Sequence, residues 1–486
     1  MPTRKLAERP PCSIHGWRLE SSYTTLPSVF FTRITPTPVT APQLKLFNHA
    51  LADELGLNVK HASATTLAAI FSGNKLPAGA QPIAQSYAGH QFGHYVQLGD
   101  GRAILLGEQM TPAGARLDIQ LKGTGQTPYS RRGDGRAAYA PMLREYVMSE
   151  AMHALGIPST RSLAVVTTGE WVMREQALLG AVLTRVSSSH LRVGTFEVVR
   201  GDRLALDALL NYTLQRHFPD CLAADNAALA LLKAVAQRQI ELIVNWMRVG
   251  FIHGVMNTDN MALSGETLDY GPCAFMDTYH PNTVYSSIDK YGRYAFGNQP
   301  QIMLWNLARL ADSLLPLLHP QPSQALTLAE EVLEKFVAMF EHRWLEMMAA
   351  KLGLSTFRAG DETLIGDLLS WMLKEKLDYT NTFSALTEGT LALEHPTFKA
   401  WYGRWQSRLQ AEERVAAQAL MRQYNPVLIP RNHHMENALK AAVAGDQTLL
   451  EQFLAVLHHP YQQPANKKYL AAPQGHEVVR QTFCGT

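Results

Sequence analysis

Three separated segments of this chain carry side chains that handle nucleotide phosphates and a divalent metal. The first is the turn Gly99-Asp100-Gly101-Arg102, the second comprises Lys122 and Glu145, and the third extends from His253 to Asp269. Glycines let a backbone approach phosphate oxygens closely, a glutamate orients the ammonium group that pairs with phosphate, and amide and carboxylate oxygens bind the metal. The sequence therefore indicates a nucleotide-phosphate site, whose parts follow one another in the order found in protein kinases.

The third segment contains the candidates for metal binding. Asn260 is the seventh residue after His253, which is the spacing of the metal-binding asparagine in a kinase catalytic loop, and Asp269 follows a short turn. We expect Asn260 and Asp269 to bind Mg²⁺ or Mn²⁺, because both supply hard oxygen ligands. The alternative is a pair of surface turns in which Asn and Asp serve only as turn formers.

One kinase residue is missing from this segment. A protein kinase carries its catalytic aspartate two residues after the histidine, where this chain has Val255. Asp259, the carboxylate beside Asn260, is then the candidate general base. Because this base comes several residues later than in kinases, the phosphorus atom that reacts need not be the γ one.

Cations earlier in the chain are candidates for binding the phosphates. Arg102 adds a permanently charged guanidinium to the glycine turn, and Arg185 and Arg192 lie on or shortly after a predicted strand. We expect Arg185 and Arg192 to hold a polyphosphate tail deep in the cleft, which leaves the α-phosphorus at the metal and pyrophosphate as the leaving group. Taken singly, each arginine and Lys122 would more often be a solvated surface residue, and the glycine turn would more often be a plain hairpin.

The elements that must position these residues fall into two parts. Strand patterns dominate residues 81–189, which also contain one helix, whereas helical periodicity dominates from residue 190 onward. We therefore expect an α+β, protein-kinase-like bilobal fold. Its small β-rich N-lobe spans 81–189, its large helical C-lobe with a C-terminal tail spans 190–486, and an N-terminal extension spans 1–80.

Individual elements follow from periodicity and from stop signals. Leu117, Ile119 and Leu121 alternate with polar residues, which predicts a strand that carries Lys122 on the face away from the core. The next helix carries Glu145 off its apolar stripe. The predicted strands are 103–109, 116–121, 163–168 and 181–186, a hairpin spans 261–269, and the predicted helices are 43–55, 141–155, 228–249, 301–315, 326–351, 364–373, 396–423 and 435–444.

Composition excludes several classes of function. The chain has 486 residues, of which 46% are hydrophobic, and this content is enough for a large buried core. A formal net charge of +2 gives no basic field for nucleic acid. No apolar run is long enough for a membrane span or a signal peptide, so we expect a cytoplasmic protein with no membrane partner. The four scattered cysteines, Cys12, Cys221, Cys273 and Cys484, predict neither a disulfide scaffold nor structural zinc.

Four strings of residues resemble the selenoprotein O family, also called SelO or YdiU. The likeness covers nearly the whole chain, from Pro36 to Cys484, and common fold motifs do not produce such strings. It implies a kinase-like fold that binds ATP in a flipped orientation and transfers AMP to Ser, Thr or Tyr hydroxyls of proteins. The strings are Gln85-Ser86-Tyr87-Ala88-Gly89-His90-Gln91-Phe92-Gly93, Gln97-Leu98-Gly99-Asp100-Gly101-Arg102-Ala103, Gly254-Val255-Met256-Asn257-Thr258-Asp259-Asn260-Met261 and Asp269-Tyr270-Gly271-Pro272-Cys273-Ala274-Phe275-Met276-Asp277.

The resemblance also implies a role for each candidate residue. Asp259 would be the proton acceptor, Asn260 and Asp269 would bind Mg²⁺, and Glu145 would pair with Lys122. Where some members carry selenocysteine this chain has Cys484, so any redox role falls to a thiol. The residues implied to contact ATP are Gly99, Gly101, Arg102, Lys122, Asp134, Gly135, Arg185 and Arg192.

Two other functions stay open at this level. One is ordinary phosphotransfer, which the missing kinase aspartate disfavours, and the other is a catalytically inactive pseudokinase that serves as a binding module, which the intact metal pair disfavours. A reversible disulfide between Cys273 and Cys484 would restrain the loop that follows Asp269. The alternative in a reducing cytosol is two unrelated free thiols.

Overall fold

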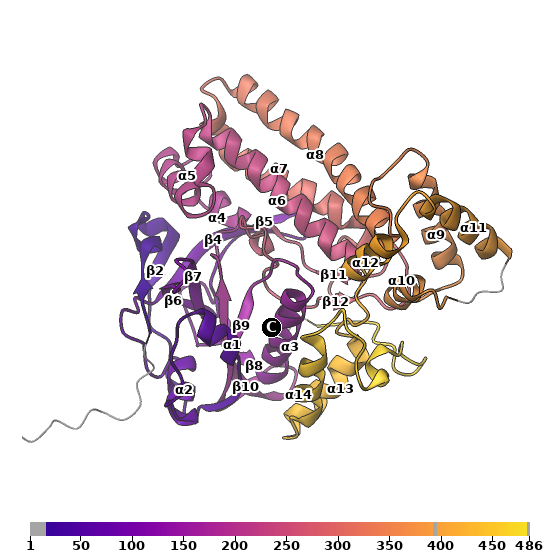
Figure 1. Cartoon of the computed structure of the whole chain (residues 1–486). Coiled ribbons are helices and arrows are strands. Elements are labelled where there is room, and N and C mark those ends of the chain that lie inside the picture. The colour runs from indigo at the N-terminus through magenta and orange to yellow at the C-terminus, as the bar shows by residue number, and fades with distance from the viewer. Residues whose placement is uncertain (1–15, 392–395, 484–486) are drawn as a thin grey trace, which may run out of the picture.

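An antiparallel sheet of ten strands forms the N-terminal part of the protein within residues 16–391 and 396–483, which the computed structural model describes. The strands are β1 (Leu19–Glu20), β2 (Phe31–Arg33), β3 (Gln43–Phe47), β4 (Ile83–Gln91), β5 (His94–Gly99), β6 (Ala103–Met110), β7 (Arg116–Lys122), β8 (Ala137–Ala138), β9 (Arg161–Met173) and β10 (Ala177–Ser187). Their order is β2-β4-β6-β7-β10-β9-β3, with β1 on β6, β5 on β4 and β8 on β10. Figure 1 shows the sheet in the indigo to magenta part of the chain. The four strands predicted from alternation are confirmed as β6, β7, β9 and β10.

Strand β7 is buried on both faces. On one face, Leu121 belongs to an apolar cluster with residues of helices α1 (His49–Glu54) and α2 (Ala64–Phe71). The other face carries Lys122, which the sequence placed away from the core. Helix α3 (Tyr139–Ala154) covers that face, so Lys122 is only 4% exposed, and the alternative in which Lys122 is a solvated surface residue is wrong.

The segment before residue 81 belongs to the same sheet. The sequence predicted a single helix over 43–55, but Gln43–Phe47 is strand β3 and the helix α1 spans only His49–Glu54. Leucines alternate with polar residues in β3, and pairing with β9 outweighs the helical pattern. Asn48 separates the two elements, and its side chain accepts a hydrogen bond from the backbone N–H of Leu51 at 3.0 Å. Because β1 and β2 also pair with the sheet, the predicted extension supplies three of its strands.

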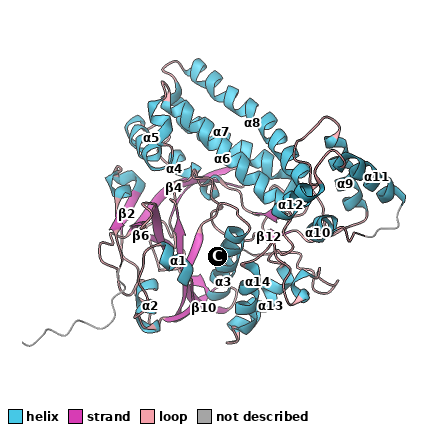
Figure 2. Ribbon diagram, in the orientation of Figure 1, coloured by secondary structure: helices cyan, strands magenta, loops and turns pink. Residues whose placement is uncertain are grey.

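Helices form the second part of the molecule (Figure 2). The helix predicted over 228–249 is α6, and Gly250 ends it in the left-handed conformation with φ 75°. The predicted hairpin over 261–269 closes through a bridge between Met261 and Thr267. The remaining elements are α4 (Val193–Glu197), α5 (Arg203–His217), α6 (Ala227–Val249), β11 (Phe251–Ile252), β12 (Ala274–Phe275), α7 (Gln299–Leu318), α8 (Pro322–Lys351), α9 (Asp361–Lys374), α10 (Tyr379–Glu388), α11 (Pro396–Leu409), α12 (Arg414–Tyr424), α13 (Asn432–Val443) and α14 (Thr448–Leu457).

The helix predicted over 396–423 is broken into α11 and α12. Helix α11 packs on α9, whereas α12 packs on α8 and α10, and one straight helix does not reach both surfaces. Arg408 at the end of α11 donates to Glu412 at 3.0 Å, and Glu412 also accepts from Ser355 Oγ at 2.6 Å. These bonds fix the turn between the two helices.

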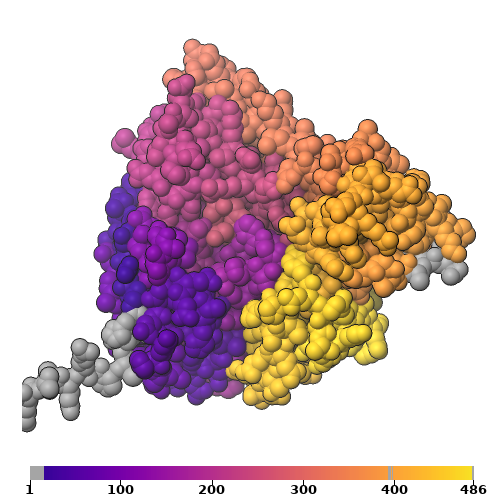
Figure 3. Space-filling view, in the orientation of Figure 1, coloured from indigo at the N-terminus to yellow at the C-terminus, as the bar shows by residue number. Residues whose placement is uncertain are grey.

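The end of the chain returns to the N-lobe. Helices α13 and α14 pack against α3, and Figure 3 shows this yellow segment against the purple sheet lobe. In the tail, Thr482 Oγ1 donates to the Pro272 carbonyl at 2.5 Å, and the Thr482 backbone N–H donates to the Tyr285 carbonyl at 2.7 Å. The helical lobe, the tail and the segment after Asp269 are therefore tied together.

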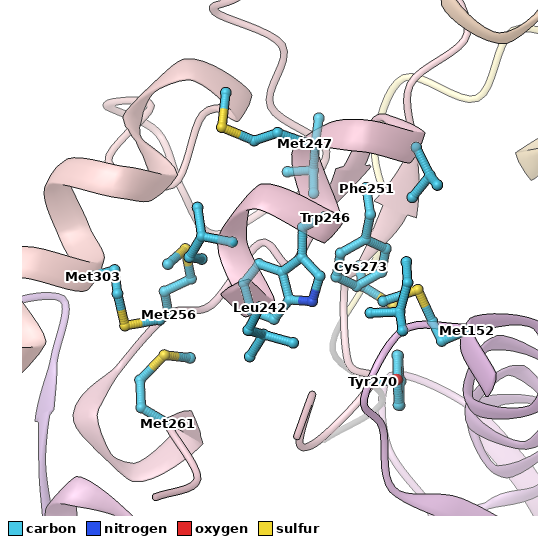
Figure 4. Packing of buried hydrophobic residues seen from close by; sticks show 14 of the residues in the cluster. Met152, Leu242, Trp246, Met247, Phe251, Met256, Met261, Tyr270, Cys273 and Met303 are labelled. Atoms are coloured by element: carbon cyan, nitrogen blue, oxygen red, sulfur yellow. The ribbon is translucent and has the colours of Figure 1, made fainter. Parts of the chain in front are cut away.

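An apolar core lies beneath the segment that carries the metal and base candidates (Figure 4). Trp246 of α6 is fully buried there, stacks on His253 at a centroid distance of 5.3 Å, and donates to Thr267 Oγ1 at 2.9 Å. Phe251 and Cys273 are also fully buried in this core. The residues from His253 to Asp269 thus rest on rigid packing. Across the described part of the chain, no helix has both the length and the apolar character needed to cross a bilayer.

Candidate active site

Lys122 of β7 lies at the centre of a buried cluster of charges. Its Nζ donates to Glu145 Oε2 at 2.7 Å and to Asp269 Oδ1 at 2.5 Å. Arg185 of β10 donates through Nε to Glu145 Oε1 at 2.9 Å and through Nη2 to Asp269 Oδ1 at 3.3 Å. The structure thus places two cations against two carboxylates, at one point between β7, β10, α3 and the segment that ends at Asp269.

The cations keep both carboxylates ionised. Burial would raise the pKa of Glu145, but the charges of Arg185 and Lys122 hold this pKa below its usual value. Burial also opposes ionisation of Asp269, but Lys122, Arg185 and Arg102 hold its pKa well below the usual value. Asp269 has φ 67°, a left-handed conformation that is strained for a residue with a side chain. Local backbone strain and three cations therefore fix the Asp269 carboxylate.

Asp259 is a buried carboxylate of a different kind. It lies in the 3₁₀ helix Thr258–Asn260, is 8% exposed, and its Oδ1 has no hydrogen-bond partner within the described part of the chain. Burial raises the pKa of Asp259 to about 6, although the charge of Arg192 acts in the opposite direction. A buried carboxylate with a free oxygen and a pKa near neutrality can accept a proton from a hydroxyl group.

Strand β4 passes directly over this base. A Cβ atom at Gly89 would lie 2.2 Å from Asp259 Oδ1, so only glycine leaves room for the carboxylate. From the other side, Arg192 Nη1 donates to the Asp259 carbonyl at 3.1 Å. The Arg192 guanidinium also lies over the Tyr87 ring of β4, at 4.2 Å from its centroid. The base is thus enclosed by β4 and by Arg192.

Three residues that the sequence analysis left without a role hold the 3₁₀ helix of the base in place. Glu197 of α4 accepts from Thr258 Oγ1 and pairs with His90 Nδ1, both at 2.5 Å. The His90 backbone N–H donates to Thr258 Oγ1 at 2.7 Å. His90 stands in one of the strings that carried the family resemblance, so the sequence contained a signal for it. Glu197 is 107 residues away from His90, and no local pattern marks it.

The glycine turn packs on the loop that follows β7. A Cβ atom at Gly99 would lie 2.3 Å from the Tyr129 ring, and one at Gly101 would lie 2.9 Å from the Tyr129 carbonyl oxygen. Thr127 Oγ1 donates to the Asp100 carbonyl at 2.6 Å, and Ser130 Oγ donates to the Gly101 carbonyl. Neither glycine has a left-handed backbone, so close packing, and not hairpin geometry, requires glycine at both positions.

Asp134 and Gly135 lie farther from the buried cluster. The Asp134 side chain is 42% exposed and accepts hydrogen bonds from Arg174 at 2.9 Å and 3.1 Å, which lower its pKa. Gly135 has φ 66°, and a Cβ atom there would lie 2.0 Å from the Gly125 carbonyl oxygen. Arg174, which the sequence analysis did not single out, therefore orients Asp134.

A cavity of about 580 Å³ brings most of the predicted residues together. A smaller cavity of about 260 Å³ shares Arg102 with it and is lined by Lys122 and Glu145. Arg185 and Arg192 are linked to the larger cavity through their hydrogen bonds to Asp269 and Asp259. The predicted residues that line the larger cavity are Gly99, Gly101, Arg102, Asp134, Gly135, Asp259 and Asp269.

The chemistry of Asp269, which lines this cavity, and of Asn260, which follows the lining residue Asp259 but does not itself line the cavity, suits a hard divalent cation bound together with a nucleotide. Asn260 Nδ2 donates to the Val255 carbonyl at 2.9 Å, which leaves the amide oxygen of Asn260 for a ligand. Asp269 contributes an ionised carboxylate, and the partnerless Oδ1 of Asp259 belongs to the residue before Asn260. Magnesium takes one or two such protein ligands and completes its octahedron with phosphate oxygens and water. No group of three or more His, Cys, Asp or Glu side chains in the described residues could hold a metal ion, so phosphate would have to complete the site.

The thiol next to this site is unreactive in the observed conformation. Cys273 is fully buried, and burial raises the pKa of its thiol to about 12. Cys484, the other member of the predicted disulfide, lies outside the described residues. The disulfide therefore stays a prediction.

Comparisons with known proteins show which proteins this chain is similar to. The family model described as "Protein adenylyltransferase SelO" matches residues 15–458 of this chain. The chain is 55% identical to the protein nucleotidyltransferase YdiU of Brevibacillus brevis over 491 aligned residues. This alignment covers 99% of this chain and 100% of that relative. It is 56% identical to the protein of the same name from Geobacillus kaustophilus over 481 aligned residues. This second alignment covers 97% of this chain and 99% of that relative.

Proposed function

This chain belongs to the SelO family of protein adenylyltransferases and is a nucleotidyltransferase, and we propose that it transfers AMP from ATP to Ser, Thr or Tyr hydroxyls of protein substrates. The observation that carries the proposal is the environment of Asp259. This carboxylate has a free, buried oxygen and a pKa of about 6, and it shares a cavity with Asp269. The position of the kinase base is filled by Val255, which has no group that accepts a proton.

The distribution of charge supports an ATP molecule whose terminal phosphates point inward. Lys122, Arg185 and Arg192 are at most 5% exposed, whereas the Asp134 side chain is 42% exposed. A polyphosphate tail stabilises buried cations, and a purine does not. We therefore place the β- and γ-phosphates at Lys122 and Arg185 and the purine toward Asp134. This orientation, flipped relative to protein kinases, leaves the α-phosphorus next to the base.

The residues then divide the reaction between them. Asp259 takes the proton of the acceptor hydroxyl, whose oxygen attacks the α-phosphorus while the bond to the bridging oxygen of pyrophosphate breaks. Lys122 and Arg185 stabilise the negative charge that develops on the departing pyrophosphate. A Mg²⁺ or Mn²⁺ ion held by Asn260 and Asp269 would neutralise phosphate charge during the transfer.

Incubation of the enzyme and acceptor proteins with ATP labelled separately at the α and γ positions tests this function. We expect the α label in protein, resistant to denaturation, and the γ label in free pyrophosphate. Transfer of the γ label would instead show kinase-like phosphotransfer and would overturn the proposal. A structure of the nucleotide complex with the purine at Lys122 would contradict the proposed orientation of ATP. The labelling experiment would then still test AMP transfer independently.

A further inference from the structure

Another open cavity, of about 650 Å³, lies beside the turn between β4 and β5. One wall comes from this turn, a second from the loop 288–293, and a third from the start of α7. We call this cavity the turn groove. Its lining residues are Phe92, His94, Ile288, Asp289, Lys290, Tyr291, Arg293, Asn298, Gln301 and Ile302.

The turn groove is connected to the base through Asn257. The Phe92 backbone N–H donates to Asn257 Oδ1 at 3.0 Å, and Tyr294 Oη donates to the same oxygen at 2.6 Å. Asn257 is two residues before Asp259. Gln91, the residue before Phe92, lines the nucleotide cavity. The turn groove and the nucleotide cavity are therefore neighbours that share the wall of the β4–β5 turn.

Two of the three Asp, Lys and Arg side chains that line the turn groove are cationic. Lys290 is exposed, and the Arg293 guanidinium lies over the Trp305 ring at 4.9 Å, with its Nε buried and without a hydrogen-bond partner. No carboxylate in the described part of the chain lies within ion-pair distance of Lys290 or Arg293. Asp289, the acidic residue of the lining, accepts hydrogen bonds from the backbone N–H groups of Arg293 at 2.9 Å and Tyr294 at 2.8 Å. Its charge is thus directed at the backbone, while the two cations remain available to a ligand.

The rim of the turn groove is apolar. Tyr291 is 98% exposed and Ile288 is 53% exposed, and both lie beside Lys290 in the loop. Exposed aromatic and aliphatic side chains next to unpaired arginine are typical of the surfaces that proteins use to bind other proteins.

We propose that the turn groove binds the segment of a protein substrate that carries the accepting hydroxyl, and that it favours segments with Glu or Asp beside that hydroxyl. The inference rests on the proposed function, because it requires a protein hydroxyl to reach Asp259. In that function ATP fills the nucleotide cavity, so the acceptor segment needs a neighbouring surface, and the turn groove is the cavity that shares the β4–β5 turn with it. Lys290 and Arg293 then meet the acidic side chains of the substrate.

Synthetic peptides test this preference directly. Each peptide contains a single serine, and the two members of a pair differ only in whether Glu or Lys flanks that serine. We expect kcat/KM for the Glu peptide to exceed that for the Lys peptide by about fivefold or more at low salt, and the difference to shrink as ionic strength rises. The double variant Lys290→Glu with Arg293→Glu should reverse the preference, since each attractive pair becomes repulsive.

Matched controls separate charge from folding. Lys335→Glu changes an exposed lysine of α8 that does not line the turn groove, and it should leave the preference unchanged. Arg293→Lys keeps the charge and should retain most of the preference. Equal use of both peptides by the parent enzyme, or an unchanged preference in the double variant, would overturn the inference while α-label transfer still supports the proposed function. Absence of α-label transfer to any hydroxyl would overturn the proposed function itself.

Discussion

Two aspartates of the candidate site have pKa values that are shifted in opposite directions. Burial raises the pKa of Asp259 to about 6, whereas Lys122 and Arg185 help to hold that of Asp269 well below its usual value. Such a pair suits two roles: the group with the raised pKa accepts a proton near neutral pH, and the group that stays ionised binds a metal. This contrast supports the roles that we propose for Asp259 and Asp269.

Replacement of Asp259 tests its role as the base in the reaction. Asp259→Asn should lower kcat by about 100-fold or more and should leave ATP affinity nearly unchanged. In the parent enzyme, activity should rise with pH through a midpoint near 6, because Asp259 must lose its proton before it can act as a base. Steady-state kinetics from pH 5 to pH 8 measure both effects. Normal activity in Asp259→Asn would exclude Asp259 as the base.

The same variant should be more stable than the parent protein at neutral pH. Folding raises the pKa of Asp259 above its unfolded value, so the ionised form destabilises the fold above about pH 6 and has no effect below about pH 4. Asn removes the charge, and the free energy of unfolding should increase by up to about 3 kcal/mol at pH 7.5, with little change at pH 4. Urea unfolding of the nucleotide-free proteins at the two pH values checks this. A stability difference of the same size at both pH values would show that the charge is not its cause.

Replacement of Asp269 distinguishes its proposed role as a metal ligand from its contacts with Lys122 and Arg185. Asp269→Ala should abolish AMP transfer, because one metal ligand is lost, but it also frees Lys122 and Arg185 from a carboxylate that they contact at 2.5 Å and 3.3 Å. ATP binding in the absence of divalent metal should therefore be kept or strengthened. Calorimetry with and without Mg²⁺ measures this. Intact transfer in the variant would defeat the metal assignment, and loss of metal-free ATP binding would defeat the placement of the phosphates.

At the scale of elements, strand β4 and helix α4 together hold the 3₁₀ helix of the base. Helix α4 supplies Glu197, which contacts both Thr258 and His90, and β4 supplies Gly89, whose missing side chain leaves room for Asp259. The base is thus positioned by elements that begin more than 60 residues before it. This arrangement makes Glu197 a positioning residue with an electrostatic effect on Asp259.

Glu197→Gln tests that effect. The negative charge of Glu197 raises the pKa of Asp259, so its removal should move the acid limb of the pH–activity profile to lower pH, while kcat falls because Thr258 and His90 lose an ionised partner. A purely structural role would lower kcat without moving the limb. Glu266→Gln removes a partly buried carboxylate that does not contribute to the pKa shift of Asp259, so it serves as the matched control and should leave the limb in place.

At the scale of the whole molecule, the C-terminal helices stabilise the segment that follows Asp269. Arg431, at the start of α13, is 1% exposed and donates to Asp277 Oδ1 at 2.6 Å and to Asp378 Oδ2 at 2.8 Å. It therefore joins α13 to the segment after Asp269 and to the start of α10. Burial raises the pKa of Asp277, and the charge of Arg431 acts in the opposite direction, so Asp277 depends on this arginine for its ionised state.

Arg431→Met should destabilise the protein by about 3–5 kcal/mol at pH 7.5, because it leaves two carboxylates without their buried partner. The loss should be smaller near pH 5, because burial raises the pKa of Asp277 and protonation of this residue removes an unpaired buried charge. Urea unfolding at the two pH values measures the difference. A loss that is equally large at both would indicate that packing, and not charge, explains the effect. Arg422→Met removes an exposed arginine paired with Glu388 and should change stability by less than about 1 kcal/mol.

Sequence patterns were enough to predict the two-lobed α+β architecture, the main strands, most of the long helices, and the order of the phosphate-handling segments. These features are local, since periodicity and short motifs encode them within a few residues. The sequence also identified Asp259 as the candidate base, because Val255 occupies the kinase position and Asp259 precedes Asn260.

How distant residues meet depends on the tertiary structure and does not follow from local sequence patterns. Arg185 reaches both Glu145 and Asp269, Glu197 reaches a residue 107 positions away, and β3 forms because β9 is there to pair with it. The division of the predicted helix 396–423 likewise depends on which helices its halves pack against. Burial is the physical reason: whether Lys122 is solvated or enclosed, and whether Asp259 has a pKa near 4 or near 6, depends on what covers the side chain, and the covering elements come from elsewhere in the chain.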